Sequence, residues 1–372
     1  MNLGQKRRRT SFFVICVVWT TWVLASYWAS AASLPEVVGE VRTRIVADCA
    51  PKVPGLSIAV GENGKIIWSE GFGFADLEAK KPVTPQTLFR IGSVSKPLTA
   101  AGLMLLVEQG KVDLDADIHR YVPDFPDKGH PITTRQLAGH LAGIRHYRGD
   151  EFYLNRHFAN VHDALTIFEN DPLLSVPGEK YSYSSYGFNL ISAVMEAAAR
   201  RDFLSYMHDA VFAPLVMTNT QPDDATRVIA QRTRFYKAKP GGGFELEPDV
   251  DNSYKWASGG FLSTPEDLVR FGSAHLRPGF LTQASLDALF TSQKTSDGKE
   301  TRYGIGWSIE SNKPGHRIWM HTGGSVGGTT ILLIQPESGL VLAMTANCTG
   351  APLSKANPAA IIRAFSALFQ GN

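Results

Sequence analysis

The sequence is poor in cysteine, with three in 372 residues. A small disulfide-stapled fold and a cysteine-based metal site both need more thiols at closer spacing, so both are excluded. Cys16 falls in an N-terminal segment with the features of an export signal, which leaves Cys49 and Cys348 as an even pair. The pair predicts either one disulfide or two inert, buried thiols.

Other chemical signatures are also missing. The ten histidines include no His-Glu-x-x-His pattern, which argues against a zinc hydrolase. Gly71-Phe72-Gly73-Phe74 lacks the spacing of a dinucleotide-binding loop and opens no predicted helix. The body of the chain has no run of like charges, no low-complexity tract and no repeat. We therefore expect no metal and no cofactor.

Acidic residues are absent from the chain before Glu36. Residues 6–9 are basic, residues 12–24 are largely apolar, and Ala29-Ser30-Ala31 offers the small side chains of a cleavage site. This pattern predicts that residues 1–31 are a signal peptide and that the protein is exported, periplasmic or secreted. The alternative is a retained anchor that places residues 12–28 in a membrane. Removal of the segment leaves 33 basic against 35 acidic residues, so no nucleic-acid partner is expected.

The remaining sequence favours a large packed core, because 44% of the residues are apolar and 19% are charged. Apolar spacing predicts a helix at Pro35–Ala47. Leu56–Val60 and Lys65–Gly73 flank the turn Glu62-Asn63-Gly64 and predict a β-hairpin. Further helices are predicted at Arg90–Gly110, Thr134–His140, Val161–Glu169, Tyr186–Arg200, Phe203–Val211 and Ala359–Phe369, and strands at Tyr303–Glu310, His316–His321, Thr329–Gln335 and Leu340–Ala346.

Strands at both ends of the chain, with helices between them, predict an α/β (α+β) fold. The simplest packing is an antiparallel sheet flanked by terminal helices, with a helical insertion. The α/β domain would be discontinuous, formed by residues 35–110 and 255–372, and residues 111–254 would form the helical domain. The crevice between the two is the expected place for a site.

Ser93-Val94-Ser95-Lys96 opens the helix predicted at Arg90–Gly110. This spacing puts the Ser93 hydroxyl and the Lys96 amine on one helix face, where free backbone N–H groups favour a developing anion. A lysine held near a hydroxyl in a buried place can lose its charge and take the serine proton. The simpler interpretation is an N-cap serine and a solvated lysine.

Two later elements could complete such a site. Tyr183, in Tyr183-Ser184-Ser185, could act as a proton shuttle if a nearby cation lowers its pKa, or it could be a packed loop aromatic. His321-Thr322-Gly323-Gly324 closes a predicted strand. An edge strand there could donate a backbone N–H to a carbonyl oxygen, and the threonine and a cationic or hydrogen-bonding histidine could orient the substrate. The alternative is an ordinary glycine turn.

The order of these three elements resembles that of the penicillin-binding-protein and class C β-lactamase-like serine hydrolases. In that family the second element is Tyr-x-Asn and the third is often His-Thr-Gly. The resemblance extends over about residues 35 to 350. Within the family, Tyr121–Pro126 and Gly143–Tyr147 are similar to the β-lactamase-like serine protein of animal mitochondria. Other segments with family-like sequence are Pro54–Ser57, Thr87–Ser93, Pro177–Ser184, Ser258–Thr264 and Tyr303–Trp307.

The resemblance implies a role for each matched residue. Ser93 corresponds to the acylated nucleophile, Lys96 to its partner and Tyr183 to the general base and acid. The backbone N–H groups of Ser93 and Gly324 correspond to the oxyanion hole. Of the substrate-binding residues Ser185, His321, Thr322 and Gly323, His321 replaces the lysine of Lys-Thr-Gly and Ser185 replaces the asparagine of Tyr-x-Asn. Serine is shorter and offers one donor where the amide offers two, so strong β-lactamase activity is not expected.

The predicted function is acyl transfer to water on a small-molecule or peptide substrate with an amide, ester or lactam bond. Two alternatives are a slowly deacylating penicillin-binding sensor and a structural, filament-forming protein. His140 and His146 are interpreted as structural or entrance residues, because the nucleophile already has a nearer base. The family's sheet pairs its first and last strands, which would bring Cys49 and Cys348 to one edge, within or just beyond bonding reach. No oligomeric state is predicted.

Overall fold

The computed structural model describes Met1, residues 32–313 and residues 316–369. The predicted signal peptide or anchor therefore lies outside the described residues, apart from Met1. From residue 32 onward the described chain forms one compact unit. In that part of the chain, no helix combines the length and the apolar character needed to cross a bilayer.

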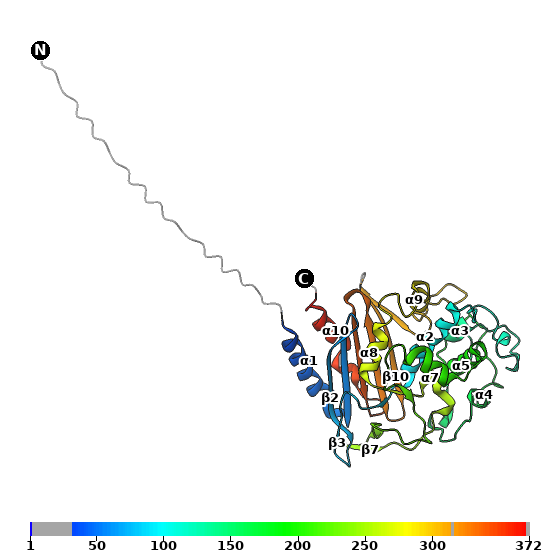
Figure 1. Cartoon of the computed structure of the whole chain (residues 1–372), viewed down its shortest axis with the longest axis horizontal. Helices are drawn as coiled ribbons and strands as arrows, with labels where there is room; N and C mark the ends of the chain where they lie inside the picture. The colour runs from blue at the N-terminus through cyan, green and yellow to red at the C-terminus, as the bar shows by residue number, and fades with distance from the viewer. Residues whose placement is uncertain (2–31, 314–315, 370–372) are drawn as a thin grey trace. The chain divides into compact units, whose positions relative to one another are not determined.

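A seven-stranded antiparallel sheet, in the order β3-β2-β1-β12-β11-β10-β9, forms the centre of this unit (Figure 1). The predicted pairing of the first and last long strands is confirmed, with Leu56 opposite Ala346. Asn63 and Gly64 both have positive φ, which suits the tight turn between β1 and β2. The strands are β1 (Gly55–Glu62), β2 (Lys65–Asp76), β3 (Lys81–Pro82), β9 (Ser308–Lys313), β10 (His316–Ser325), β11 (Gly328–Gln335) and β12 (Leu340–Ala346).

Both faces of the sheet are buried, because its central strands alternate between two apolar cores. Ile58 and Leu342 belong to one core, which α1 (Leu34–Asp48) and α10 (Pro358–Ser366) cover. Ala59 belongs to the other core, with α8 (Pro265–Ser273) and the helices beyond it. The predicted antiparallel sheet with terminal helices packed against it is thus confirmed, and both terminal helices lie on one of its faces.

The regular structure in the middle of the chain is mainly helical, and long loops connect its elements. Its helices are α3 (Thr134–Ala138), α4 (Val161–Leu165), α5 (Ser185–Ala199) and α6 (Phe203–Met207). It also contains short strands, so the insertion is not purely helical. Its β5 (Gln221–Pro222) pairs with β8 (Phe261–Ser263), which pairs with β4 (Phe89–Arg90), while β6 (Tyr236–Ala238) and β7 (Phe244–Leu246) form a hairpin. The division into an α/β domain and a helical domain stays a prediction.

Two predicted boundaries shift at glycines with positive φ. The helix expected from Arg90 becomes a 3₁₀ turn at Gly92–Val94 followed by α2 (Ser95–Glu108), because Gly92 has φ +50°. The strand expected from Tyr303 begins at Ser308, after Gly306 with φ +76°. The other described helices are α7 (Trp256–Gly259) and α9 (Gln283–Phe290).

The cysteine pair is resolved as two free thiols. Cys49 and Cys348 are both buried and both belong to the core beneath α1 and α10, so the predicted common edge is confirmed. Burial raises the pKa of Cys348 to about 11 and also raises that of Cys49. These buried thiols hold their protons and are poor nucleophiles.

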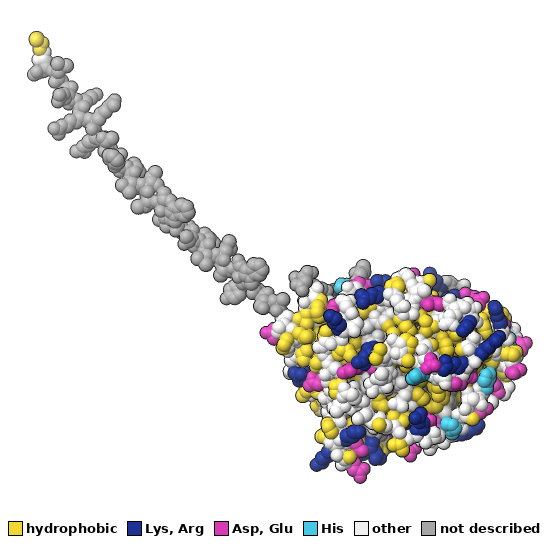
Figure 2. Space-filling model, in the orientation of Figure 1, with side chains coloured by type: hydrophobic (Ala, Val, Ile, Leu, Met, Phe, Trp, Pro, Cys, Tyr) yellow, Lys and Arg dark blue, Asp and Glu magenta, His cyan; other side chains and the backbone are white. Residues whose placement is uncertain are grey.

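Charge is evenly distributed over the part of the surface that Figure 2 shows. Lysine and arginine side chains alternate with aspartate and glutamate side chains across this face. This mixture agrees with the near balance of basic and acidic residues in the sequence.

Candidate active site

Ser93 and Lys96 meet at the start of α2, as their spacing predicts. Ser93 lies in the 3₁₀ turn Gly92–Val94 and keeps part of its surface open, whereas Lys96 lies in the first turn of α2 and is fully buried. The Lys96 amine is 3.0 Å from the Ser93 hydroxyl oxygen. The alternative of a solvated lysine is therefore wrong.

The environment of Lys96 favours a neutral amine. Its Nζ lies 3.0 Å from Ser185 Oγ and 2.8 Å from the carbonyl oxygen of Ser258. None of the ion pairs among the described residues involves Lys96. Burial, and then the charge of Lys255, lower the pKa of Lys96 well below its usual value. A neutral amine can donate to the oxygens of residues 185 and 258 and keep its lone pair for the Ser93 proton.

Tyr183 lies close to both Ser93 and Lys96. Its side chain forms a hydrogen bond with Ser93, and its ring centroid is 4.9 Å from Lys96 Nζ. Burial raises the pKa of Tyr183 above its usual value, so the lowered pKa that a tyrosinate base requires is not found. In this arrangement the phenol holds its proton, and Lys96 is the stronger candidate for the base.

The end of β10 forms an open edge beside Ser93. Among the described strands, β9 pairs with β10 only as far as Met320, opposite Ser308. A Cβ on Gly323 would be 1.9 Å from the carbonyl oxygen of Ile91, and a Cβ on Gly92 would be 2.9 Å from the amide nitrogen of Gly324. Glycine is required at these two contacts, which bring the backbone N–H groups of Ser93 and Gly324 into one small region.

His321 is buried, and both of its ring nitrogens have hydrogen-bond partners. Its neighbour Thr322 is exposed. His321 Nδ1 lies 2.7 Å from the Thr322 carbonyl oxygen, and Nε2 lies 2.9 Å from the Tyr303 hydroxyl. Burial and the nearby Lys96 lower the pKa of His321 to about 3. The ring is therefore neutral and hydrogen-bonding. Of the two forms that the sequence left open, the cationic one is not supported.

Ser185 is the first residue of α5, which Ser184 caps by accepting the N–H of Gly187. The Ser185 hydroxyl accepts from Lys96 and also bonds the Tyr147 hydroxyl. Its backbone N–H donates to His146 Nδ1 over 3.1 Å. The residue in the position of the family's asparagine thus accepts from the lysine and keeps a single O–H donor, where the amide has two N–H donors.

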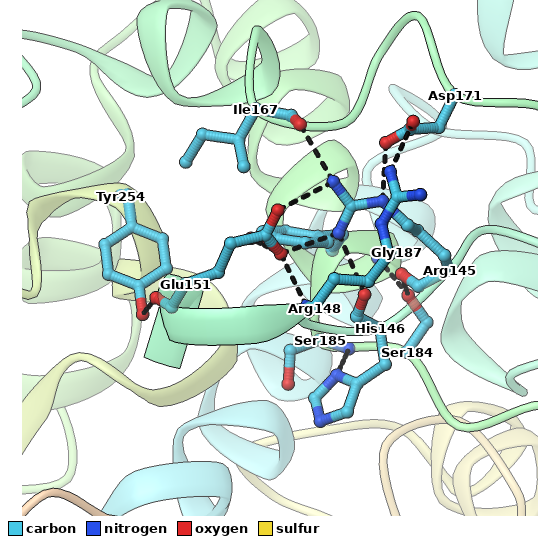
Figure 3. A network of polar contacts seen from close by, with 11 residues as sticks. Arg145, His146, Arg148, Glu151, Ile167, Asp171, Ser184, Ser185, Gly187 and Tyr254 are labelled. Atoms are coloured by element: carbon cyan, nitrogen blue, oxygen red, sulfur yellow. Dashed lines mark hydrogen bonds and ion pairs between the residues drawn. The ribbon is translucent and has the colours of Figure 1, made fainter. Parts of the chain in front are cut away.

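A buried arginine holds the loop that carries His146 and Tyr147 (Figure 3). Arg145 donates to both carboxylate oxygens of Glu151 at 2.7 and 2.9 Å, and it pairs with Asp171. Ser184 Oγ donates to the Arg145 carbonyl oxygen over 2.7 Å. These charge-assisted bonds fix the loop against the start of α5.

Sequence reasoning missed Lys255 and Tyr147. Lys255 is fully buried, and its Nζ lies 4.8 Å from the ring centroid of Phe152 and 4.9 Å from that of Tyr254. No motif marks Lys255, and the family-like segment Gly143–Tyr147 gave no role to Tyr147. The segment Ser258-Gly259-Gly260 did match the family in sequence. Only the structure shows that the Ser258 carbonyl oxygen accepts a hydrogen bond from Lys96.

A metal site is not found in the described ranges, where no three or more His, Cys, Asp or Glu side chains are grouped to hold an ion. His140, expected to be structural, is buried between the rings of Tyr183 and Tyr303, with centroids at 4.3 and 4.6 Å. It therefore packs behind the tyrosine that contacts Ser93.

Comparisons with known proteins agree with this architecture. A family model described as Beta-lactamase matches residues 42–365. The human "Serine beta-lactamase-like protein LACTB, mitochondrial" is 32% identical, over 76% of this chain and 69% of that protein. "Penicillin-binding protein 4*" of Bacillus subtilis (strain 168) is 27% identical, over 74% of this chain and 64% of that protein. The octameric penicillin-binding protein homologue from Pyrococcus abyssi shares the fold, with a TM-score of 0.75 at 24% identity over 89% of this chain and 77% of that one.

Proposed function

The chain belongs to the beta-lactamase family and is a serine hydrolase, and we propose that it acts through an acyl-enzyme on Ser93. The observation that carries this proposal is the 3.0 Å contact between the Ser93 hydroxyl and the buried Lys96 amine. Ser93 Oγ attacks the carbonyl carbon of the substrate, and its proton passes to Lys96 Nζ. The carbonyl π electrons move to oxygen, where the N–H groups of Ser93 and Gly324 stabilise the negative charge.

Collapse of this tetrahedral intermediate breaks the bond to the leaving group. The leaving group takes a proton from Lys96, either directly or through the Tyr183 hydroxyl that contacts Ser93. Water then attacks the acyl-enzyme, gives its proton to the same pair and releases the acid. Ser93 recovers its proton, so the enzyme returns to its starting state. His321, with both ring nitrogens engaged, positions Tyr303 and the end of β10.

The substrates we propose are small esters or peptides, with β-lactams as poor substrates. The support comes from Ser185, which contacts Lys96 through its hydroxyl and offers one hydrogen-bond donor where an asparagine amide offers two. The loss of a hydrogen bond to a buried or reacting polar group costs about 1–3 kcal/mol.

Labelling with a fluorophosphonate and turnover of a chromogenic ester test the mechanism. Ser93→Ala should abolish covalent labelling and lower turnover by at least about a thousandfold. The matched control is Ser95→Ala, because Ser95 is buried and its hydroxyl accepts from the Phe261 N–H. Mass spectrometry should locate the tag on Ser93, and a tag on another serine refutes the assignment. Labelling without turnover identifies a slow-deacylating sensor, and no labelling favours a structural, filament-forming protein.

We also propose that the protein is exported, on the basis of the basic and apolar pattern of residues 1–31. N-terminal sequencing of the protein from its native compartment tests this. A new terminus near residue 32 supports cleavage, and an intact terminus in the membrane fraction supports an anchor through residues 12–28.

A further inference from the structure

We infer that His146 contributes a substrate-contacting hydrogen-bond donor through Nε2, beside position 185, where the family pattern has an asparagine amide. The inference rests on the proposed function and adds to it a specificity-determining residue. It assigns a substrate class, namely acyl groups that carry an oxygen acceptor, such as an amide carbonyl, beyond the bond that is cleaved.

The first step is the tautomer of His146. The Ser185 backbone N–H donates to His146 Nδ1 over 3.1 Å, so Nδ1 must be unprotonated. A neutral imidazole carries one proton, which must then lie on Nε2. That Nε2–H has no hydrogen-bond partner among the residues that the structure describes, and the side chain is only partly buried.

The second step is the direction of this donor. Figure 3 shows the His146 ring and the Ser185 hydroxyl projecting to the same side, away from the Arg145 ion pairs. The His146 ring is 5.5 Å from the Tyr183 ring, centroid to centroid and edge-on, and Tyr183 bonds Ser93. Nε2 therefore lies on the side of the loop where Ser185 meets Lys96.

The third step explains how the site keeps a hydrogen-bond donor for the substrate although residue 185 is a serine. The Ser185 hydroxyl is committed to Lys96 and Tyr147. One residue of the family pattern is thus replaced by two here. Ser185 contacts the base, and His146, held by the Ser185 N–H, offers the free N–H.

The charges around the ring keep it in the donating, neutral form. Burial has the largest effect on the pKa of His146, and the basic side chains around the ring, Arg145 among them, also disfavour its protonation, while Glu151 favours it. Together these effects lower the pKa of His146 to about 4. Protonation would also place a hydrogen on Nδ1, against the Ser185 N–H. The Nε2 donor is therefore present throughout the neutral pH range.

The two roles of the ring can be separated by two amides of different length. In His146→Asn, the side-chain oxygen can take the place of Nδ1 and accept the Ser185 N–H, but the side chain is too short to reach the Nε2 position. In His146→Gln, the longer amide can place an N–H near Nε2. Both replacements are polar and uncharged, and thermal melts followed by circular dichroism check the fold of each.

The readout is a ratio of kcat/KM for two p-nitrophenyl esters of similar acyl length, those of N-acetylglycine and of pentanoic acid. Only the first has an acyl-side carbonyl acceptor. We expect His146→Asn to lower this ratio about tenfold and His146→Gln to keep it within about threefold of wild type. In a Ser185→Asn background, which supplies a new amide, His146→Asn should lower the ratio by less than about threefold.

Three results overturn the inference. An unchanged ratio in His146→Asn means that Nε2 does not contact the acyl chain. A loss in His146→Gln with retention in His146→Asn means that the ring only anchors the Ser185 N–H. If His146→Asn lowers the ratio equally in the wild-type and Ser185→Asn backgrounds, residues 146 and 185 do not contact the same substrate group. Wild-type protein that hydrolyses neither ester and takes no fluorophosphonate would instead overturn the proposed function.

Discussion

Lys96 and Lys255 are two fully buried lysines of one core region, yet they have different surroundings. Lys96 lies within hydrogen-bond distance of three oxygen atoms, from Ser93, Ser185 and Ser258. Lys255 Nζ faces the rings of Phe152 and Tyr254, and no hydrogen bond or ion pair joins it to another described residue. Burial lowers the pKa of both, that of Lys255 to about 7.

The comparison shows that burial alone does not make a lysine a base. Burial lowers the pKa of both Lys255 and Lys96, but only Lys96 has a hydroxyl within reach of its lone pair. The contribution of Lys255 acts at a distance, because its positive charge helps to lower the pKa of Lys96.

The sharpest test of this difference is the same substitution at both positions. Lys96→Met should lower ester turnover by at least about a thousandfold, because the Ser93 hydroxyl loses its proton acceptor. Lys255→Met, measured at pH 9, should keep turnover within about tenfold of wild type. Steady-state kinetics and fluorophosphonate labelling rates provide the measurement. Equal losses in the two variants would mean that Lys255 takes part in the chemistry directly.

Changing Ser185, one of the oxygen partners of Lys96, should have a smaller effect than changing Lys96. We expect this effect in the choice of substrate. Ser185→Asn restores the family's amide, whose oxygen can still accept from Lys96 while its N–H₂ faces the substrate. We expect acylation by a penicillin to become roughly tenfold faster, as judged by intact-protein mass spectrometry over time. Efficient cephalosporin hydrolysis by the unmodified protein would contradict the proposal that Ser185 makes β-lactams poor substrates.

The distant action of Lys255 should appear in the pH profile. Turnover requires neutral Lys96, so kcat/KM should fall as the pH drops through the pKa of Lys96. Lys255→Met removes a nearby positive charge, which raises the pKa of Lys96 and moves this acid limb to higher pH by roughly half a unit to one unit. An acid limb that stays in place would show that the two lysines do not interact.

The smallest effect concerns stability. The folded-state pKa of Lys255 is about 7, and the unfolded value is about 10.4. Between these values the unfolded chain holds a proton that the folded chain lacks, so wild-type stability rises with pH by at most about 1.4 kcal/mol per unit. Lys255→Met lacks this dependence. Its stabilisation over wild type, measured by urea unfolding at pH 7, 8 and 9, should therefore shrink as the pH rises.

Much of the fold was predictable because its signals are local. The turn at Asn63-Gly64, the continuous apolar run of β12 and the apolar spacing of α1 all depend on a few neighbouring residues. The displaced start of α2 was not predictable in the same way. It depends on the close contact of Gly92 with the backbone of Gly324, which is far away in the sequence.

The sequence by itself determined that Ser93 and Lys96 lie side by side, because the two residues are one helical turn apart and their relation is fixed by helix geometry. Only the tertiary structure decided what surrounds them. The oxygens of Ser185 and Ser258, the charge of Lys255 and the donor of His146 come from separate segments. The pKa of Lys96 and the direction of a free N–H depend on packing across these segments, and no spacing within one segment encodes them.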